Sequence, residues 1–197
     1  MRPTPISSLT LIALLLIASP AEAHLMSTGL GPIYDGISHF ALSPEDLVPS
    51  VALALLAGQC GPGTGRRVIF VLPVAWLLGG VAGLSAPGVK SFPDIGWISF
   101  MLLGGLVAAN VKLSSTAITV LAVLLGSFHG FIDGATMGSA VDGIRVLIGI
   151  AATVFTLCTL VAAAIVALPW AVARIGVRVL GSWTAATGML LLGWSLR

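Results

Sequence analysis

The chain has 197 residues, of which 57% are hydrophobic and 8% are charged, and its mean hydropathy is +1.10. A soluble domain carries about a quarter charged residues, so this composition excludes one and indicates an integral membrane protein. A net charge of +2 without a basic patch gives no support for binding nucleic acid. The two cysteines, Cys60 and Cys158, lie far apart and support neither a disulfide framework nor a thiolate metal site.

The first 23 residues have the pattern of a cleavable signal peptide. Arg2 supplies the positive start, residues 9–18 the apolar middle, and residues 21–23 (AEA) the small-x-small cleavage site. An apolar run of about ten residues is too short to cross a hydrocarbon core roughly 30 Å thick, although an uncleaved anchor is the alternative. Cleavage after residue 23 would leave His24 at the new N-terminus, where its α-amine and imidazole could chelate a metal together.

Apolar segments fill most of the remaining sequence. They are separated by stretches that hold turn residues and nearly all the charges. The segments are residues 44–60, 68–85, 95–111, 115–132, 144–168 and 175–194. We therefore predict an all-α polytopic membrane protein, in which residues 24–197 form a single domain of six transmembrane helices.

The charges are distributed unevenly between the two ends of these predicted spans. If the mature N-terminus lies outside the cytoplasm, the inner loops hold most of the basic residues, as the positive-inside rule requires. These are Arg66, Arg67, Lys112, Arg174 and Arg178. All three histidines and every acid after residue 23 then fall at the outer side. The acids are Asp35, Glu45, Asp46, Asp94, Asp133 and Asp142. The pattern predicts a multi-pass protein of the bacterial inner membrane whose outer face attracts cations.

The first predicted span starts with a capping pattern that contains possible ligands. Residues 47–60 extend only about 21 Å as a helix, so the span must include the preceding turn, Ser43 to Asp46. A serine cap, a proline at the first position and an acid three residues after the cap favour a helix start there. Non-helical backbone before it, including His39, needs surrounding protein or a cavity at this depth. Short, proline-interrupted spans indicate binding sites in transporters; the alternative is that Glu45 and Asp46 only stabilise the helix end.

The fourth predicted span ends with a second group of possible ligands, in the sequence LLGSFHGFIDGATMG. His129 and Asp133 are four residues apart, so they share one face if the helix continues. An imidazole and a carboxylate at this spacing can bind one divalent cation. The alternative is that His129 complements the helix dipole and that Asp133 opens a turn at Gly134.

No catalytic motif accompanies these residues. The sequence contains no HExxH, no phosphate-binding glycine loop and no GxSxG. Ser127 lies two residues before His129, a spacing that turns the two side chains apart on a helix. An intramembrane hydrolase would need another serine, so we expect that the protein is not an enzyme.

The segments GISHFALSPEDL and FHGFIDGATM, placed after a signal peptide, resemble the two motifs of the HupE/UreJ family. This is a family of small bacterial membrane proteins implicated in supplying nickel or cobalt to hydrogenase and urease. Its first motif is similar to H-P-x-x-G-x-D-H. His39 matches the leading histidine, Glu45 stands at the aspartate position, and Asp46 stands where the second histidine would be.

The second family motif is similar to F-H-G-x-x-H-G-x-E. His129 matches its first histidine, Asp133 occupies the position of the second, and Thr136 falls where the acid would be. This sequence departs from the family motifs in two further ways. It lacks the proline that follows the leading histidine of the first motif, and over the two motifs it carries carboxylates in place of two histidines.

The residues and the resemblance together predict a secondary transporter, or permease, for a divalent transition-metal ion, nickel or cobalt. Imidazole and carboxylate ligands suit borderline or harder ions, and a site without thiolate can release its ion. The expected metal ligands are His39, Glu45, Asp46, His129 and Asp133, with His24 and Asp35 capturing ions at the outer face. No permanently bound cofactor is expected. The expected partners are the metal ion and the lipid bilayer, with a second copy of the chain or a metalloenzyme-maturation protein as further candidates.

A non-transporting membrane scaffold or accessory subunit is the alternative function. Glycine clusters are typical of faces where helices approach closely, and this reading would use them to bind other proteins. It predicts that bulky residues at Gly79, Gly104 or Gly105 destroy function. Alanine at His39, His129 and Asp133 would leave function intact.

Overall fold

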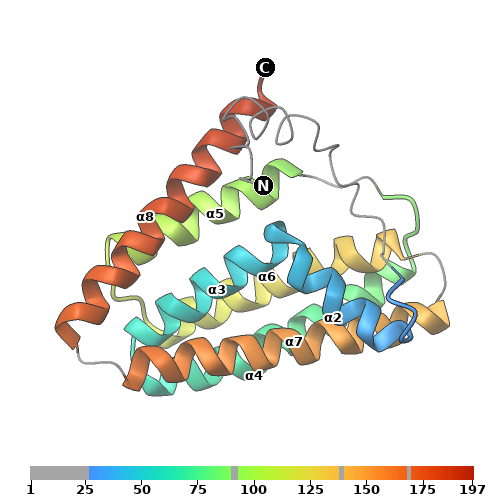
Figure 1. The fold of residues 1–197 in the computed structure, drawn as a ribbon, viewed down its shortest axis with the longest axis horizontal. Coiled ribbons are helices and arrows are strands. Elements are labelled where there is room, and N and C mark those ends of the chain that lie inside the picture. Colours follow the sequence, from blue (N-terminus) through green and yellow to red (C-terminus); the bar gives the residue numbers. More distant parts are fainter. Residues whose placement is uncertain (1–26, 90–92, 138–139, 168–169) are drawn as a thin grey trace, which may run out of the picture.

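The computed structural model describes residues 27–89, 93–137, 140–167 and 170–197, and in these ranges every regular element is an α-helix. The helices are α2 (Pro32–Leu42), α3 (Pro44–Gln59), α4 (Pro62–Leu84), α5 (Pro93–Ala108), α6 (Ser115–Thr136), α7 (Ala140–Ala167) and α8 (Trp170–Ser195). Figure 1 shows α2, α3, α4, α6 and α7 as one bundle, with α5 and α8 as a pair along its side. The predicted signal peptide and His24 lie outside the described residues.

Several helices are long and apolar enough to cross a membrane. Among the described helices, four meet this criterion alone, namely α4, α6, α7 and α8, and α2 and α3 meet it together as one broken span. The predicted third span corresponds to α5, whose apolar part is shorter. The all-α prediction is thus confirmed and a membrane protein is supported, while the count of six spans stays a prediction.

The structure corrects the expectation that His39 lies in non-helical backbone. Residues 32–42 form a helix, α2, with His39 in its last turn. The helix ends at Ser43, which is extended (φ −96°, ψ 95°). Proline disfavours helical backbone in the residue before it, so Pro44 accounts for the break, and α3 leaves at 74° to α2. The predicted start of α3 is confirmed, although the Ser43 side chain makes no capping hydrogen bond.

Helix α3 lies at the centre of the bundle. Its sixteen residues extend about 24 Å, less than the roughly 30 Å of a hydrocarbon core, so it needs α2 to complete a span. It contacts every other described helix, and all its residues from Ala52 to Gln59 are buried. The first turn is tied together by a hydrogen bond of 2.7 Å from Ser50 Oγ to the Asp46 carbonyl oxygen.

A stripe of glycines brings α4 and α6 into direct backbone contact. A Cβ added to Gly126, Gly130 or Gly134 of α6 would overlap backbone oxygens of α4, at Leu72, Trp76 and Gly80 respectively. The spacing of four residues on both helices places these positions on one face of each. Because His129 and Asp133 adjoin this stripe in sequence, the close packing also holds them against α4.

The two ends of the bundle differ in charge. Asp46, Asp133 and Asp142 lie where α3 begins, α6 ends and α7 begins. At the opposite end Lys112 Nζ donates to the Gln59 carbonyl oxygen, and Arg178 Nε donates to that of Ala108 at 2.8 Å. These contacts agree with the separation of acids and bases predicted from the sequence, while the orientation in the membrane remains a prediction.

Candidate metal centre

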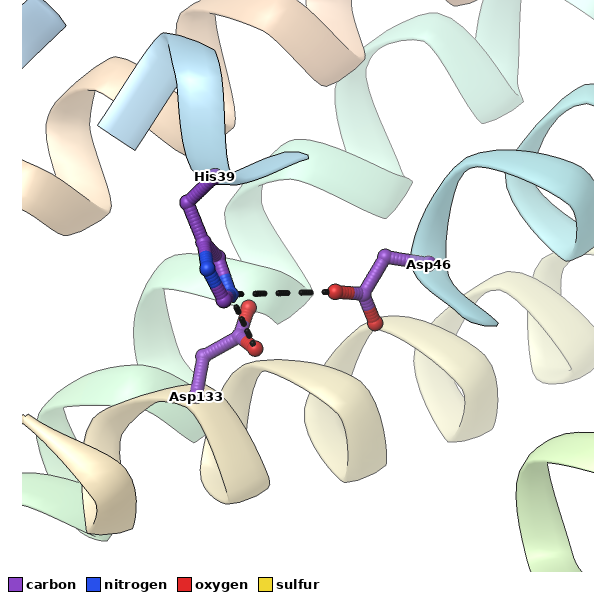
Figure 2. Close-up of side chains that lie close together, drawn as sticks. All are labelled: His39, Asp46 and Asp133. Atoms are coloured by element: carbon purple, nitrogen blue, oxygen red, sulfur yellow. Dashed lines mark hydrogen bonds and ion pairs between the residues drawn. The ribbon is translucent and has the colours of Figure 1, made fainter. Parts of the chain in front are cut away.

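Three side chains from three helices converge beside the break between α2 and α3. His39 comes from the last turn of α2, Asp46 from the first turn of α3, and Asp133 from α6 near its end. Figure 2 shows the imidazole and both carboxylates pointing toward one another. One ligand atom from each residue lies within 4.8 Å of the other two. This cluster, His39–Asp46–Asp133, has the geometry of three ligands for one cation.

The distances within the cluster define which atoms face its centre. His39 Nε2 lies 3.3 Å from Asp133 Oδ1 and 4.0 Å from Asp46 Oδ2. Asp46 is 4% exposed and Asp133 is 5% exposed. Burying an ionised carboxylate costs free energy unless a cation or a hydrogen-bond donor compensates for its charge. Two buried carboxylates beside one imidazole therefore favour a bound positive charge.

The helix break places His39 and Asp46 in favourable electrostatic positions. Asp46 lies at the N-terminus of α3, where the helix dipole is positive and stabilises a carboxylate. His39 lies at the C-terminus of α2, where the dipole is negative and stabilises a cation. Broken helices whose ends face an ion in this way are a feature of secondary transporters.

His129 supports the cluster through Asp46. Its Nδ1 lies 2.7 Å from Asp46 Oδ1, and with an ionised carboxylate, which only accepts, Nδ1 must carry the proton. The Asp46 carboxylate thus bridges the two histidines, with Oδ1 toward His129 and Oδ2 toward His39. The other ring nitrogen, Nε2, is buried without a hydrogen-bond partner among the described residues, which leaves a free lone pair next to the cluster.

Trp76 of α4 is a functional candidate that the sequence analysis missed. Its indole Nε1 donates a hydrogen bond of 2.8 Å to Asp133 Oδ2, and the side chain is fully buried. A signal was available, because a tryptophan in the middle of an apolar span needs a partner for its N–H group. The nearest carboxylate in space belongs to α6, and a single sequence does not reveal that pairing.

The structure brings together some of the predicted ligands and not others. His39, Asp46 and Asp133 form the cluster, and His129 joins it through Asp46. Glu45 lies next to Asp46 in the first turn of α3 but is not one of the three clustered residues.

Asp35 lies apart from the cluster. Its carboxylate is exposed and accepts hydrogen bonds from the Thr28 backbone N–H at 2.6 Å and from the Thr28 hydroxyl at 2.7 Å. It shapes the start of α2, and a capture role for it stays a prediction.

Comparison with known proteins places the chain in a family. The family model described as HupE / UreJ protein matches residues 12–191. The chain belongs to the HupE/UreJ family. The family is associated with nickel or cobalt transport or with the maturation of urease and hydrogenase, and it is not an enzyme family. No curated protein and no solved structure matches the chain. The two segments that resemble the family motifs are the ones that supply His39, Asp46, His129 and Asp133.

Proposed function

We propose that the protein is a secondary permease for a divalent transition-metal ion, nickel or cobalt, in the bacterial inner membrane. The observation that carries the proposal is the convergence of His39, Asp46 and Asp133 from three helices at a helix break. Ionisable side chains within membrane-spanning segments are costly and usually mark the path of an ion or a substrate. Here both carboxylates are buried and the imidazole is partly buried, and all three residues lie in the two segments that resemble the family motifs.

The ligand set supports a transition-metal cargo. Two carboxylates neutralise a divalent charge, and an imidazole nitrogen suits nickel, cobalt and zinc better than it suits magnesium or calcium. The cluster includes no thiolate, which would hold such an ion too tightly for release. His129 orients Asp46 from outside the cluster, as outer hydrogen-bond partners do at metal sites.

Transport requires a conformational change, because the ion has no polar route along α3. Further along α3 than Ser50, every residue from Ala52 to Gly58 is buried and apolar. The sequence has no nucleotide-binding loop, so the ion gradient, the membrane potential or a partner must supply the energy. Movement of α2 and α3 about the Ser43–Pro44 break would open the cluster first to one side and then to the other.

Uptake of radiolabelled nickel and cobalt by cells that lack their own importers tests the proposal. The variant D133N removes one ligand charge and keeps the size of the side chain, so we expect a loss of uptake of about tenfold or more. The control is D142N, which makes the same charge change at an exposed residue, 61% accessible, on α7. Both variants must be present in the membrane at wild-type amounts.

The outcomes separate transport from the alternative functions. Uptake in wild type and D142N but not in D133N supports the permease and its site. Uptake of both ions by wild type and D133N alike would contradict the site. The absence of uptake by wild-type protein would contradict transport and favour an accessory subunit.

The glycines offered for the scaffold function are partly used inside the chain. Gly79 packs against the Ser127 backbone, and Gly104 packs against α8 near Gly181. Gly105 has open space around it. Glycine content therefore gives the scaffold function no separate support.

A further inference from the structure

Trp76 contacts two of the proposed ligands, His129 and Asp133, and the neighbour of a third, His39, although it cannot bind a metal itself. An indole N–H is a donor only, so its role toward an ion must act through another residue. The ring packs edge-on against Phe40, the neighbour of His39, with centroids 5.5 Å apart. It also lies against the His129 ring, at 5.5 Å and 34°. Its N–H bonds to Asp133.

The two carboxylate oxygens of Asp133 have different partners. Oδ2 accepts the indole N–H at 2.8 Å, while Oδ1 faces His39 Nε2 at 3.3 Å. A single N–H occupies one of the two lone pairs of Oδ2 and fixes the orientation of the carboxylate, so that Oδ1 is the oxygen turned toward the centre of the cluster. Ionised acceptors form the stronger hydrogen bonds in proteins, and full burial of Trp76 excludes competing water.

The position of Trp76 is itself fixed by the backbone. The Trp76 carbonyl oxygen occupies the space that a Cβ on Gly130 would need, so α4 cannot slide along α6 at this point. The indole N–H and the Asp133 carboxylate are therefore aligned by close helix packing. A rigid donor of this kind preserves ligand geometry better than a flexible side chain.

We propose that Trp76 is a positioning residue that sets ion selectivity by holding Asp133 as a one-oxygen ligand. This inference rests on the proposed transport function. Calcium and other ions that prefer oxygen ligands take up to eight of them and often use both oxygens of a carboxylate. Smaller ions that accept nitrogen bind well with fewer ligands. Occupation of Oδ2 by the indole therefore disfavours manganese and calcium relative to nickel and cobalt.

Binding of Ni²⁺ and Mn²⁺ to the full-length protein, purified in detergent, tests this role. The variant W76F keeps an aromatic ring and removes the N–H donor, and we expect the ratio of Ni²⁺ to Mn²⁺ affinity to fall about tenfold, as for other outer partners of metal ligands. The control W183F removes an indole that is 75% exposed on α8 and should leave the ratio unchanged.

A second variant and a spectroscopic measurement keep the test decisive if W76F folds poorly. In the replacement Trp76→β-(3-benzothienyl)alanine, sulfur takes the place of the N–H in a bicyclic ring of nearly the same shape. Infrared difference spectra upon adding Mn²⁺ report the splitting between the two carboxylate stretches, which is smaller for two-oxygen than for one-oxygen binding. We expect the smaller splitting only in proteins without the indole N–H.

The results distinguish three conclusions. A lower ratio with the changed splitting supports the role of Trp76. An equal loss of affinity for both ions, with the splitting unchanged, would overturn it and leave Trp76 as a packing residue. If wild-type protein binds neither ion, the proposed function fails, and the selectivity role fails with it.

Discussion

His39 Nε2 and Asp133 Oδ1 meet at a distance of 3.3 Å although the two residues are 94 positions apart in the chain. One belongs to a short helix that precedes the first apolar segment, the other to the end of α6. A site of this kind exists only when the helices are packed together. Ligand binding and the folded arrangement of α2, α3 and α6 must therefore stabilise each other.

Nickel is accordingly expected to raise the midpoint of thermal unfolding of the purified protein. An ion that binds only the folded state adds about 2.7 kcal/mol when its free concentration is 100 times the dissociation constant. The shift should vanish with excess chelator. It should be lost in D133N and kept in D142N. An equal shift in D133N would place the ion elsewhere in the molecule.

Two substitutions at His129 test the roles of its two ring nitrogens separately. The amide nitrogen of asparagine can take the place of Nδ1 and donate to Asp46, whereas the amide of glutamine reaches only the position of Nε2. Because Nδ1 makes the 2.7 Å contact, we expect H129N to keep more nickel uptake than H129Q, by about tenfold. The reverse order, measured at equal protein levels, would show that Nε2 binds the ion directly.

Substitution of Gly130 should destabilise the bundle. In G130A the added methyl group would overlap the Trp76 carbonyl oxygen, which forces α4 and α6 apart at a cost of about 1–3 kcal/mol. Thermal unfolding in detergent measures the loss. The control G105A adds the same group where nothing lies within 4 Å, and there the higher helix propensity of alanine predicts a gain of up to about 1 kcal/mol. Equal stability of the two variants would contradict this packing.

Pro44 should be needed for transport because it maintains the break. In P44A the restriction on Ser43 disappears, so α2 and α3 can join into one helix and separate His39 from Asp46. We expect nickel uptake to fall severalfold without loss of protein. The matched control is P62A at the start of α4, where Gly61, with φ of 117°, still interrupts the helix. Equal uptake by P44A and wild type would show that the packing of α2 against α7 is enough to hold the bend.

Local sequence patterns predicted the starts of α3 and α6, at residues 44 and 115, whereas α4, α7 and α8 begin four to six residues before the predicted apolar segments. At two helix starts the contacts are local: Ser114 accepts a capping hydrogen bond from the Ala117 N–H at 3.1 Å, and Asp142 pairs with Arg145 at 3.6 Å. Helix α6 continues to Thr136 and buries His129 and Asp133 together. The alternative in which Asp133 opens a turn is therefore wrong.

Longer-range features escaped prediction for physical reasons. The segment of α2 contains glycine, serine and few strong helix formers, and its helix depends on packing against α7. One local signal was available: Pro32 follows a glycine, as Pro62 does at the start of α4. The meeting of Trp76 with Asp133 depends on the register between α4 and α6, which glycine contacts set.

The buried apolar run of α3 from Ala52 to Gly58 also has a consequence for the whole cell. These seven residues extend about 10 Å, and along them α3 offers no side chain on which a proton or a hydrated ion could pause. In the conformation described, this part of α3 therefore provides no conducting path for ions or protons. For a cell that uses the permease proposed above, the consequence is that the protein at rest would not let protons leak along α3.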